Sequence, residues 1–294
     1  MIIFNAATIA AYGFLSAAIL AIWLPESINK NTRIPIWAVL LAISCIFGVH
    51  YAIVEFGGVL YLLGLNFACI LVKHQNKWFG ISAAIAVIVL VAGLFLHRAP
   101  FFNNPLVFDN FLLSNQASAY SQYWNYDKAA AGLILLAHFG DVCRSARDWK
   151  AMLKNSYRPS ILTIVATISL SLIFGYIRPD TTIVIAFFAW AWSNLIFTCI
   201  AEEMFFRGFI QKHLLPLSPN YGYQIAIVIF VGALFGCAHL GAGMNYVILA
   251  SVAGIGYGYS YFKTGRIESA ILTHFFLNSS HFLFFTYPFA KDAL

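Results

Sequence analysis

The chain has 294 residues, of which 61% are hydrophobic and only 10% are charged, and its mean hydropathy is +0.80. Soluble domains carry about 25% charged residues, so this composition excludes a soluble globular protein and predicts a membrane protein. The formal net charge of +6 does not indicate a nucleic-acid partner, because we expect the basic residues to lie in short loops between membrane spans. The five cysteines form no CxxC pair and predict neither a disulfide framework nor a metal site.

Apolar windows of about 20 residues predict membrane-spanning helices. The first window has no basic region before it and is long enough to span, so we expect a transmembrane helix there and not a cleaved signal peptide. The windows before residue 98 are Ile3–Leu24, Ile34–Val54, Phe56–Val72 and Trp78–Leu96. The later windows are Tyr126–Phe139, Ser160–Ile177, Thr181–Leu214, Tyr223–Leu240, Tyr246–Phe262 and Ile267–Phe285. They predict an all-α fold, a polytopic transmembrane helical bundle with about 8–10 membrane helices. Gly232 and Gly236, four residues apart, predict a close approach of two helices.

The basic residues predict the orientation of these helices. If every window crosses, an external N-terminus places twelve of the 17 Lys and Arg residues in the cytoplasm, as the positive-inside rule favours. The twelve are Lys30, Arg33, Lys73, Lys77, Arg144, Arg147, Lys150, Lys154, Arg158, Lys212, Lys263 and Arg266. The long non-spanning stretch Arg98–Asn125 then lies outside. Tyr126–Phe139 is short for a full span, so a tilted or re-entrant helix stays open there.

Three charged residues interrupt the apolar segment Thr181–Leu214, namely Glu202, Glu203 and Arg207. A charge at the centre of a bilayer helix costs about 2.5–3.5 kcal/mol, so such residues indicate a functional site by default. On a helix, Glu203 lies four residues before Arg207, which is the favourable spacing for an ion pair. Glu202 points about 100° away, is left unpaired within its helix and is therefore a candidate for proton transfer. The alternative is a helix that leaves the membrane at Glu202 with its charges solvated.

Further polar residues lie on the helices that follow. His239 ends the sequence FGCAH, and taken alone it is as readily a packed histidine as a catalytic one. His274 and Asn278 are four residues apart on the last helix and share one face, which His281 continues. Because lipid cannot satisfy polar side chains, this face is expected to meet protein or a water-filled cavity.

These side chains permit the hydrolysis of an amide. A carboxylate can take a proton from water, and a histidine can hold that water or share the proton. His274 and Asn278 can donate hydrogen bonds to an oxyanion that forms on a carbonyl. Nucleophilic and thermolysin-like routes have no support, since the sequence contains neither a nucleophile elbow nor HExxH. Two histidines and a carboxylate can alternatively bind zinc, although none of the usual ligand spacings is present.

The motifs EExxxR, FxxxH and HxxxN, in this order on successive late helices, resemble those of the CPBP family, also called Abi. This family contains the CAAX prenyl endopeptidases and bacteriocin-processing enzymes. The resemblance runs from about Asp127 to His281 and implies a glutamate-type intramembrane endopeptidase.

The resemblance also implies a role for each matching residue. Glu202 matches the carboxylate that activates water, and His239 matches its partner. His274 and Asn278 match the pair proposed to form the oxyanion hole. The structural acid and arginine of the family correspond to Glu203 and Arg207.

On this basis we expect a protease core in residues 126–294, preceded by transmembrane helices and an external loop in residues 1–125. The expected partners are the lipid bilayer and a membrane-anchored protein or peptide substrate, with no nucleic acid. No cofactor is expected, and zinc is the alternative. The expected location is multi-pass in the membrane, in a bacterial inner (cytoplasmic) membrane.

Two other functions stay open. A non-catalytic membrane immunity or scaffold protein would use the motifs to hold helices together, but an unpaired Glu202 would destabilise it. A transporter would use the polar face as a proton path. It is disfavoured because the sequence shows no inverted repeat and no paired broken helices.

Overall fold

The computed structural model describes residues 6–24, 35–181 and 186–293. Most of these residues are helical, which confirms the predicted all-α class. The chain divides into two compact units that alternate along the sequence. The first unit contains residues 1–107, 122–140 and 196–205, and the second contains residues 108–121, 141–195 and 206–294. The predicted boundary between residues 125 and 126 stays a prediction. Lys30 and Arg33 lie outside the described residues.

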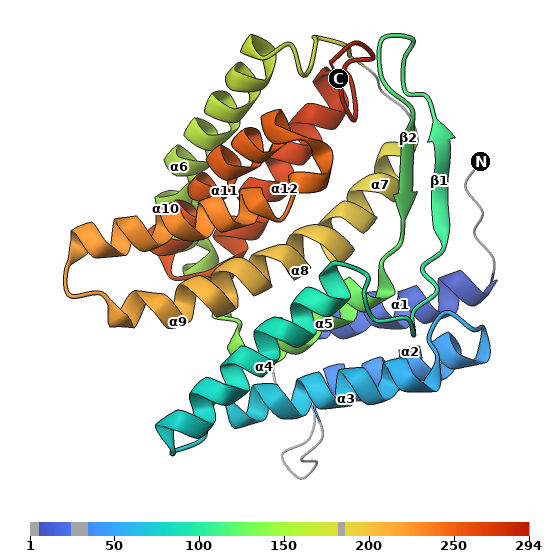
Figure 1. The fold of residues 1–294 in the computed structure, drawn as a ribbon, viewed down its shortest axis with the longest axis vertical. Helices are drawn as coiled ribbons and strands as arrows, with labels where there is room; N and C mark the ends of the chain where they lie inside the picture. The colour runs from blue at the N-terminus through green and yellow to red at the C-terminus, as the bar shows by residue number, and fades with distance from the viewer. Residues whose placement is uncertain (1–5, 25–34, 182–185, 294) are drawn as a thin grey trace. The chain divides into compact units, whose positions relative to one another are not determined.

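The first unit is built around a short internal helix. Its helices are α1 (Ala6–Ala21), α2 (Ile36–His50), α3 (Phe56–Leu71), α4 (Lys77–Phe95) and α5 (Tyr126–Phe139) (Figure 1). The bounds of α5 are those predicted, and it packs against α1, α3 and α4 with most of its residues buried. Fourteen residues of α-helix are about 21 Å long, less than the ~30 Å of a bilayer core. α5 is therefore an internal packing helix of this unit.

Helix α4 shows how local sequence sets these elements. The Asn76 side chain accepts hydrogen bonds from the backbone N–H groups of Trp78 and Phe79, which satisfies donors that a helix N-terminus leaves unpaired. Val87, Val91 and Leu94 recur at helical spacing and are completely buried, so one face of α4 packs inside the unit. Large apolar side chains elsewhere on α4 are exposed, as for a helix that faces lipid, namely Trp78, Phe79, Ile81, Ile85, Ile88 and Val89.

Two described helices are long and apolar enough to cross a membrane. They are α4 (Lys77–Phe95) and α6 (Ala146–Ile173). Shorter apolar helices in the described residues are Thr8–Ala21, Ile36–His50, Phe56–Leu71 and Tyr221–Cys237. The predicted total of about 8–10 membrane helices stays a prediction.

The second unit is organised around α11. It contains α6 (Ala146–Ile173), α7 (Ala186–Ser193), α10 (Tyr221–Cys237), α11 (Met244–Thr264) and α12 (Ile267–Phe284), and α11 packs against α6, α10 and α12. A Cβ atom at Gly232 would lie 2.6 Å from the backbone nitrogen of Ile255, and one at Gly236 would lie 2.6 Å from the carbonyl oxygen of Val247. Only glycine permits this spacing, so the predicted close approach of helices is confirmed for α10 and α11.

Helix α6 begins well before the predicted window Ser160–Ile177. Ser145 and Asp148 form a capping box, in which each side chain accepts a hydrogen bond from the other residue's backbone N–H. The basic residues Arg147, Lys150, Lys154 and Arg158 therefore lie on α6, and the prediction that they occupy a loop is wrong. Apolar-window reasoning missed this because the first turns of α6 are polar.

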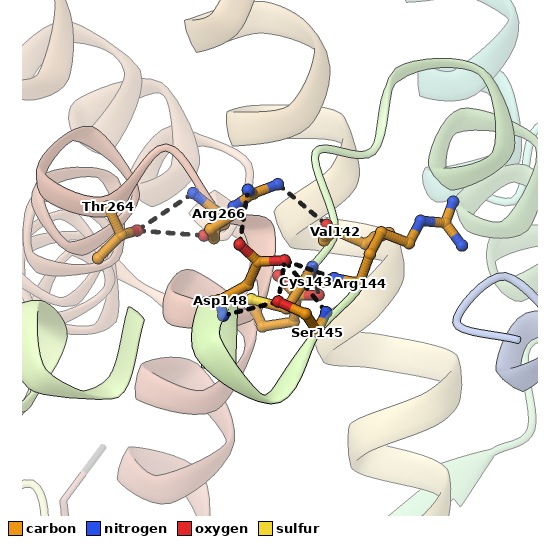
Figure 2. Close-up of polar contacts among 8 residues, drawn as sticks. Val142, Cys143, Arg144, Ser145, Asp148, Thr264 and Arg266 are labelled. Atoms are coloured by element: carbon orange, nitrogen blue, oxygen red, sulfur yellow. Dashed lines mark hydrogen bonds and ion pairs between the residues drawn. The ribbon is translucent and has the colours of Figure 1, made fainter. Parts of the chain in front are cut away.

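One arginine ties the start of α6 to the turn between α11 and α12 (Figure 2). The Arg266 guanidinium donates to the carbonyl oxygen of Val142 at 3.0 Å and to Asp148 at 3.3 Å. Beside it, the backbone N–H of Cys143 donates to the carboxylate of Glu268 at 2.6 Å. These bonds fix the beginning of α12, the helix that carries His274 and Asn278.

A continuous helical stretch runs from Ala186 to Leu214, which confirms the predicted helix from Ala186 onward; residues 182–185 lie outside the described part. It is not a uniform α-helix. The short α8 (Ile200–Glu203) is flanked by π-helical segments, Asn194–Cys199 and Met204–Gln211, and is continued by α9 (Lys212–Leu214).

The stretch predicted to lie outside the membrane contains a two-stranded sheet that the sequence analysis did not anticipate. Its strands are β1 (Leu106–Phe111) and β2 (Tyr120–Tyr123) (Figure 1). Their aromatic and branched residues favour strands. Between the strands, the backbone N–H of Ser118 donates to the carbonyl oxygen of Phe289 at 3.0 Å, which joins this loop to the C-terminal segment of the second unit.

Candidate active site

The two adjacent glutamates lie on the short α8, between two π-helical segments. π-Helical turns within helices are frequent at functional sites, since they redirect side chains that regular spacing would place elsewhere. Glu202, Glu203 and Arg207 are 6%, 0% and 0% exposed. The alternative that these charges are solvated at a helix end is therefore wrong.

Glu202 is paired, contrary to the sequence-based expectation. The ammonium of Lys128 on α5 donates to Oε1 of Glu202 at 2.5 Å, and the two side chains are 14% and 8% exposed. Both residues belong to the first unit. The expectation failed because it considered only cations on the glutamate's own helix, whereas Lys128 lies 74 residues earlier.

Within the second unit, two side chains of the Met204–Gln211 segment bond to successive turns of α11. The Arg207 guanidinium donates to the carbonyl oxygen of Gly254 at 2.7 Å, and the Gln211 amide donates to that of Gly258 at 2.9 Å. Both side chains are completely buried. These bonds are compatible with the structural role of Arg207, which stays a prediction, whereas Gln211 was missed because a single amide carries no recognisable motif.

The Phe235 ring is a neighbour of three predicted site residues. The Arg207 guanidinium lies 4.8 Å from its centroid, the His239 ring 4.8 Å and the His274 ring 5.8 Å. Phe235 is the first residue of the FxxxH motif, so the structure gives a physical reason for an aromatic residue one turn before the histidine.

His239 is half-buried and lies just beyond the end of α10. Its Nδ1 is 2.8 Å from the carbonyl oxygen of Phe235. A carbonyl can only accept, so Nδ1 carries the proton and Nε2 of the neutral ring is an acceptor. The centroid of the Tyr246 ring lies 5.4 Å from that of the imidazole.

His274 and Asn278 share one face of α12, as predicted. The buried His274 ring stacks on Tyr257 with centroids 4.6 Å apart and planes 13° from parallel. The Asn278 amide nitrogen donates to the side-chain oxygen of Asn194 at 3.3 Å. His281 has a different environment, because its Nε2 donates to the carbonyl oxygen of Thr286 near the end of α12. It therefore serves to hold the chain after this helix.

The predicted site residues are divided between the units. Glu202 and Glu203 belong to the first unit, while Arg207, His239, His274 and Asn278 belong to the second. The ion pair of Glu203 with Arg207 and the meeting of Glu202 with the histidines stay predictions. Among the described residues, no group of three or more His, Cys, Asp or Glu side chains is placed to hold a metal ion.

An apolar cavity of about 700 Å³ lies within the first unit. Trp37 and Leu41 of α2, Leu62 and Asn66 of α3, and Ile134 of α5 are among the residues that line it. Its few polar groups leave a surface suited to hydrocarbon.

The family model for type II CAAX prenyl endopeptidases, Rce1-like, matches residues 184–280. These residues, here called the Rce1-like segment, are similar to that family. The predicted resemblance is thereby confirmed, and the six predicted site positions all fall inside the Rce1-like segment. The proposed extension of the resemblance back to Asp127 lies outside the matched residues and stays a prediction.

No curated protein and no solved structure matches the chain. The Rce1-like family is membrane-embedded, and the two long apolar helices fit this.

Proposed function

We propose that this chain is a glutamate-type intramembrane endopeptidase that hydrolyses a peptide bond in a membrane-associated protein or peptide. The observation that carries this proposal is the match of residues 184–280 to the CAAX prenyl endopeptidase family, with Glu202, His239, His274 and Asn278 inside it. The proposed location is a bacterial cytoplasmic membrane, which the chain crosses several times.

In the proposed mechanism, Glu202 acts as the general base. Its carboxylate takes a proton from water while the water oxygen attacks the scissile carbonyl carbon. The carbonyl oxygen becomes an oxyanion, which His274 and Asn278 stabilise as hydrogen-bond donors. The C–N bond then breaks, and the proton held by Glu202 passes to the leaving amine. The products are a carboxylic acid and an amine, and no metal or other co-reactant is consumed.

The local environment of His239 supports its role as partner of Glu202. The bond from Nδ1 to the carbonyl oxygen of Phe235 sets the tautomer in which Nε2 can accept a hydrogen bond from the water that Glu202 activates. Asn278 uses one of its two amide hydrogens on Asn194. The second hydrogen is the one we assign to the oxyanion.

Glu202→Gln tests the proposal directly. This substitution keeps the shape of the side chain but removes the base, so turnover falls by about 10²–10⁴-fold. The purified protein is reconstituted in phospholipid vesicles with a prenylated CAAX-type peptide. In parallel, membrane peptides from cells with and without the active chain are compared by mass spectrometry. The matched control is Glu55→Gln, since Glu55 is an exposed glutamate at the start of α3.

The outcomes separate the alternatives. Cleavage that survives Glu202→Gln removes the carboxylate from the mechanism. If a chelator abolishes cleavage, the zinc-dependent variant of the hydrolysis is correct. A third outcome is that the folded protein gives no cleavage product either in the vesicle assay or in the comparison of membrane peptides. In that case the non-catalytic scaffold function is favoured.

A further inference from the structure

Lys128 is a largely buried cation outside the Rce1-like segment, and the family match assigns it no role. Its ammonium is 2.5 Å from Oε1 of Glu202 and lies over the Phe95 ring, 5.2 Å from the centroid. These three residues belong to the first unit.

A buried ion pair is poor evidence of a purely stabilising role. Removing both charges from water costs several kcal/mol per ion, and apolar residues of similar volume often stabilise a fold as well or better. In the proposed function, Glu202 is also the residue that takes the proton from water. The role of Lys128 is therefore better explained by its effect on the Glu202 carboxylate than by a contribution to stability.

The neighbouring residues hold Lys128 in place. Asp127, which is 1% exposed, accepts hydrogen bonds from His97 Nδ1 at 2.7 Å and from Asn104 Nδ2 at 3.0 Å. One turn after Lys128, a Cβ atom at Gly132 would lie 2.6 Å from the Cα of Ala201. The backbones of α5 and α8 are thus in contact beside the Lys128–Glu202 pair, and α5 is anchored at its first turn.

We propose that Lys128 is a positioning residue for the water-activating carboxylate of Glu202, an inference that rests on the proposed function. The hydrogen bond to Oε1 fixes the rotamer of Glu202. The buried ammonium also compensates the negative charge of the buried carboxylate. Lys128 keeps its own proton throughout, and no bond to substrate is assigned to it.

Lys128→Met is the main test, in phospholipid vesicles with the prenylated CAAX-type peptide. Misplacement of a catalytic group by about 1 Å costs about 100-fold, so we expect kcat per folded molecule to fall by about this factor with KM unchanged. Lys128→Arg retains a charged donor and restores most of kcat. In the Glu202→Gln background, Lys128→Met causes no further loss, because it acts through Glu202. Lys77→Met, at an exposed lysine of the same unit, is the control.

Each result is decisive. If Glu202→Gln abolishes cleavage but Lys128→Met leaves kcat unchanged, the inference is wrong and the proposed function stands. If Lys128→Met lowers only the yield of folded protein, the pair is structural and the inference is equally wrong. If Glu202→Gln is active, the proposed function itself fails. Should Lys128→Met not fold, Lys128→Gln and Lys128→Arg provide the same comparison.

Discussion

Phe235 contacts Arg207, His239 and His274. An aromatic ring offers a negative face to a guanidinium and an apolar surface to an imidazole. The same side chain can therefore support a structural cation and two candidate functional histidines. This arrangement leads to predictions that separate structural residues from functional ones.

Arg207→Leu is expected to destabilise the fold. It removes a charged hydrogen bond to the carbonyl oxygen of Gly254 and the contacts with three aromatic rings, Phe206, Phe235 and Tyr257. A hydrogen bond to a charged group contributes about 1.5–3 kcal/mol, so the free energy of unfolding should fall by about 2 kcal/mol. Thermal unfolding in detergent measures this. Arg147→Leu, at an exposed arginine of α6, should leave the unfolding temperature unchanged.

His274 and His281 provide a matched pair on one helix. His274→Ala is expected to lower kcat by about 10²-fold, because it removes a donor from the proposed oxyanion site. His281→Ala removes a bond to the carbonyl oxygen of Thr286 and should affect the folded yield, but not kcat per folded molecule. Equal kcat values for the two variants would contradict the assignment of His274.

At the scale of elements, the packing of α10 on α11 depends on glycine. Gly232→Val places carbon atoms where the backbone of Ile255 lies, so the helices must separate. We expect the folded yield in detergent, measured by size-exclusion chromatography, to drop sharply. Gly241→Ala is the control, since no atom lies within 4 Å of a Cβ built there. A normal yield for Gly232→Val would mean that the two helices can repack.

The elements were predictable where apolar residues dominate a segment despite a few charges, as for Tyr126–Phe139 and for the helix that includes Glu202. The sequence reasoning failed where polar residues continue a helix, which is why Ala146 was not recognised as the start of α6. It also failed for Lys128, whose partner is distant in sequence. Motifs identify residues that lie on known patterns, whereas partners such as Lys128 and Gln211 are visible only when the chain is folded.

At the scale of the whole molecule, the predicted orientation is testable by cysteine labelling. Burial, together with the nearby Glu268 carboxylate, raises the pKa of the Cys143 thiol to about 12. The raised pKa keeps this thiol protonated at pH 8, and only the thiolate reacts, so Cys143 should resist alkylation until the protein is denatured. The positive control is Arg144→Cys, which places a cysteine at the exposed neighbouring position. This substitution is made in a variant whose own cysteines have been replaced.

The same labelling reports the side of the membrane. A membrane-impermeant maleimide should modify Arg144→Cys only after cells are permeabilised, because this residue is predicted to be cytoplasmic. Leu112→Cys, at an exposed position between β1 and β2, should react in intact cells. The reverse pattern would invert the proposed topology.

The alternation of the two units along the chain has a practical consequence for the design of shorter fragments. Residues 196–205, which include Glu202, belong to the unit formed mainly by residues 1–107 and 122–140, although the residues on either side of them do not. A truncated gene that encodes only residues 184–280 would lack Lys128 and the whole of α5. Such a fragment would carry EExxxR, FxxxH and HxxxN and still leave Glu202 without the helix that packs beside it.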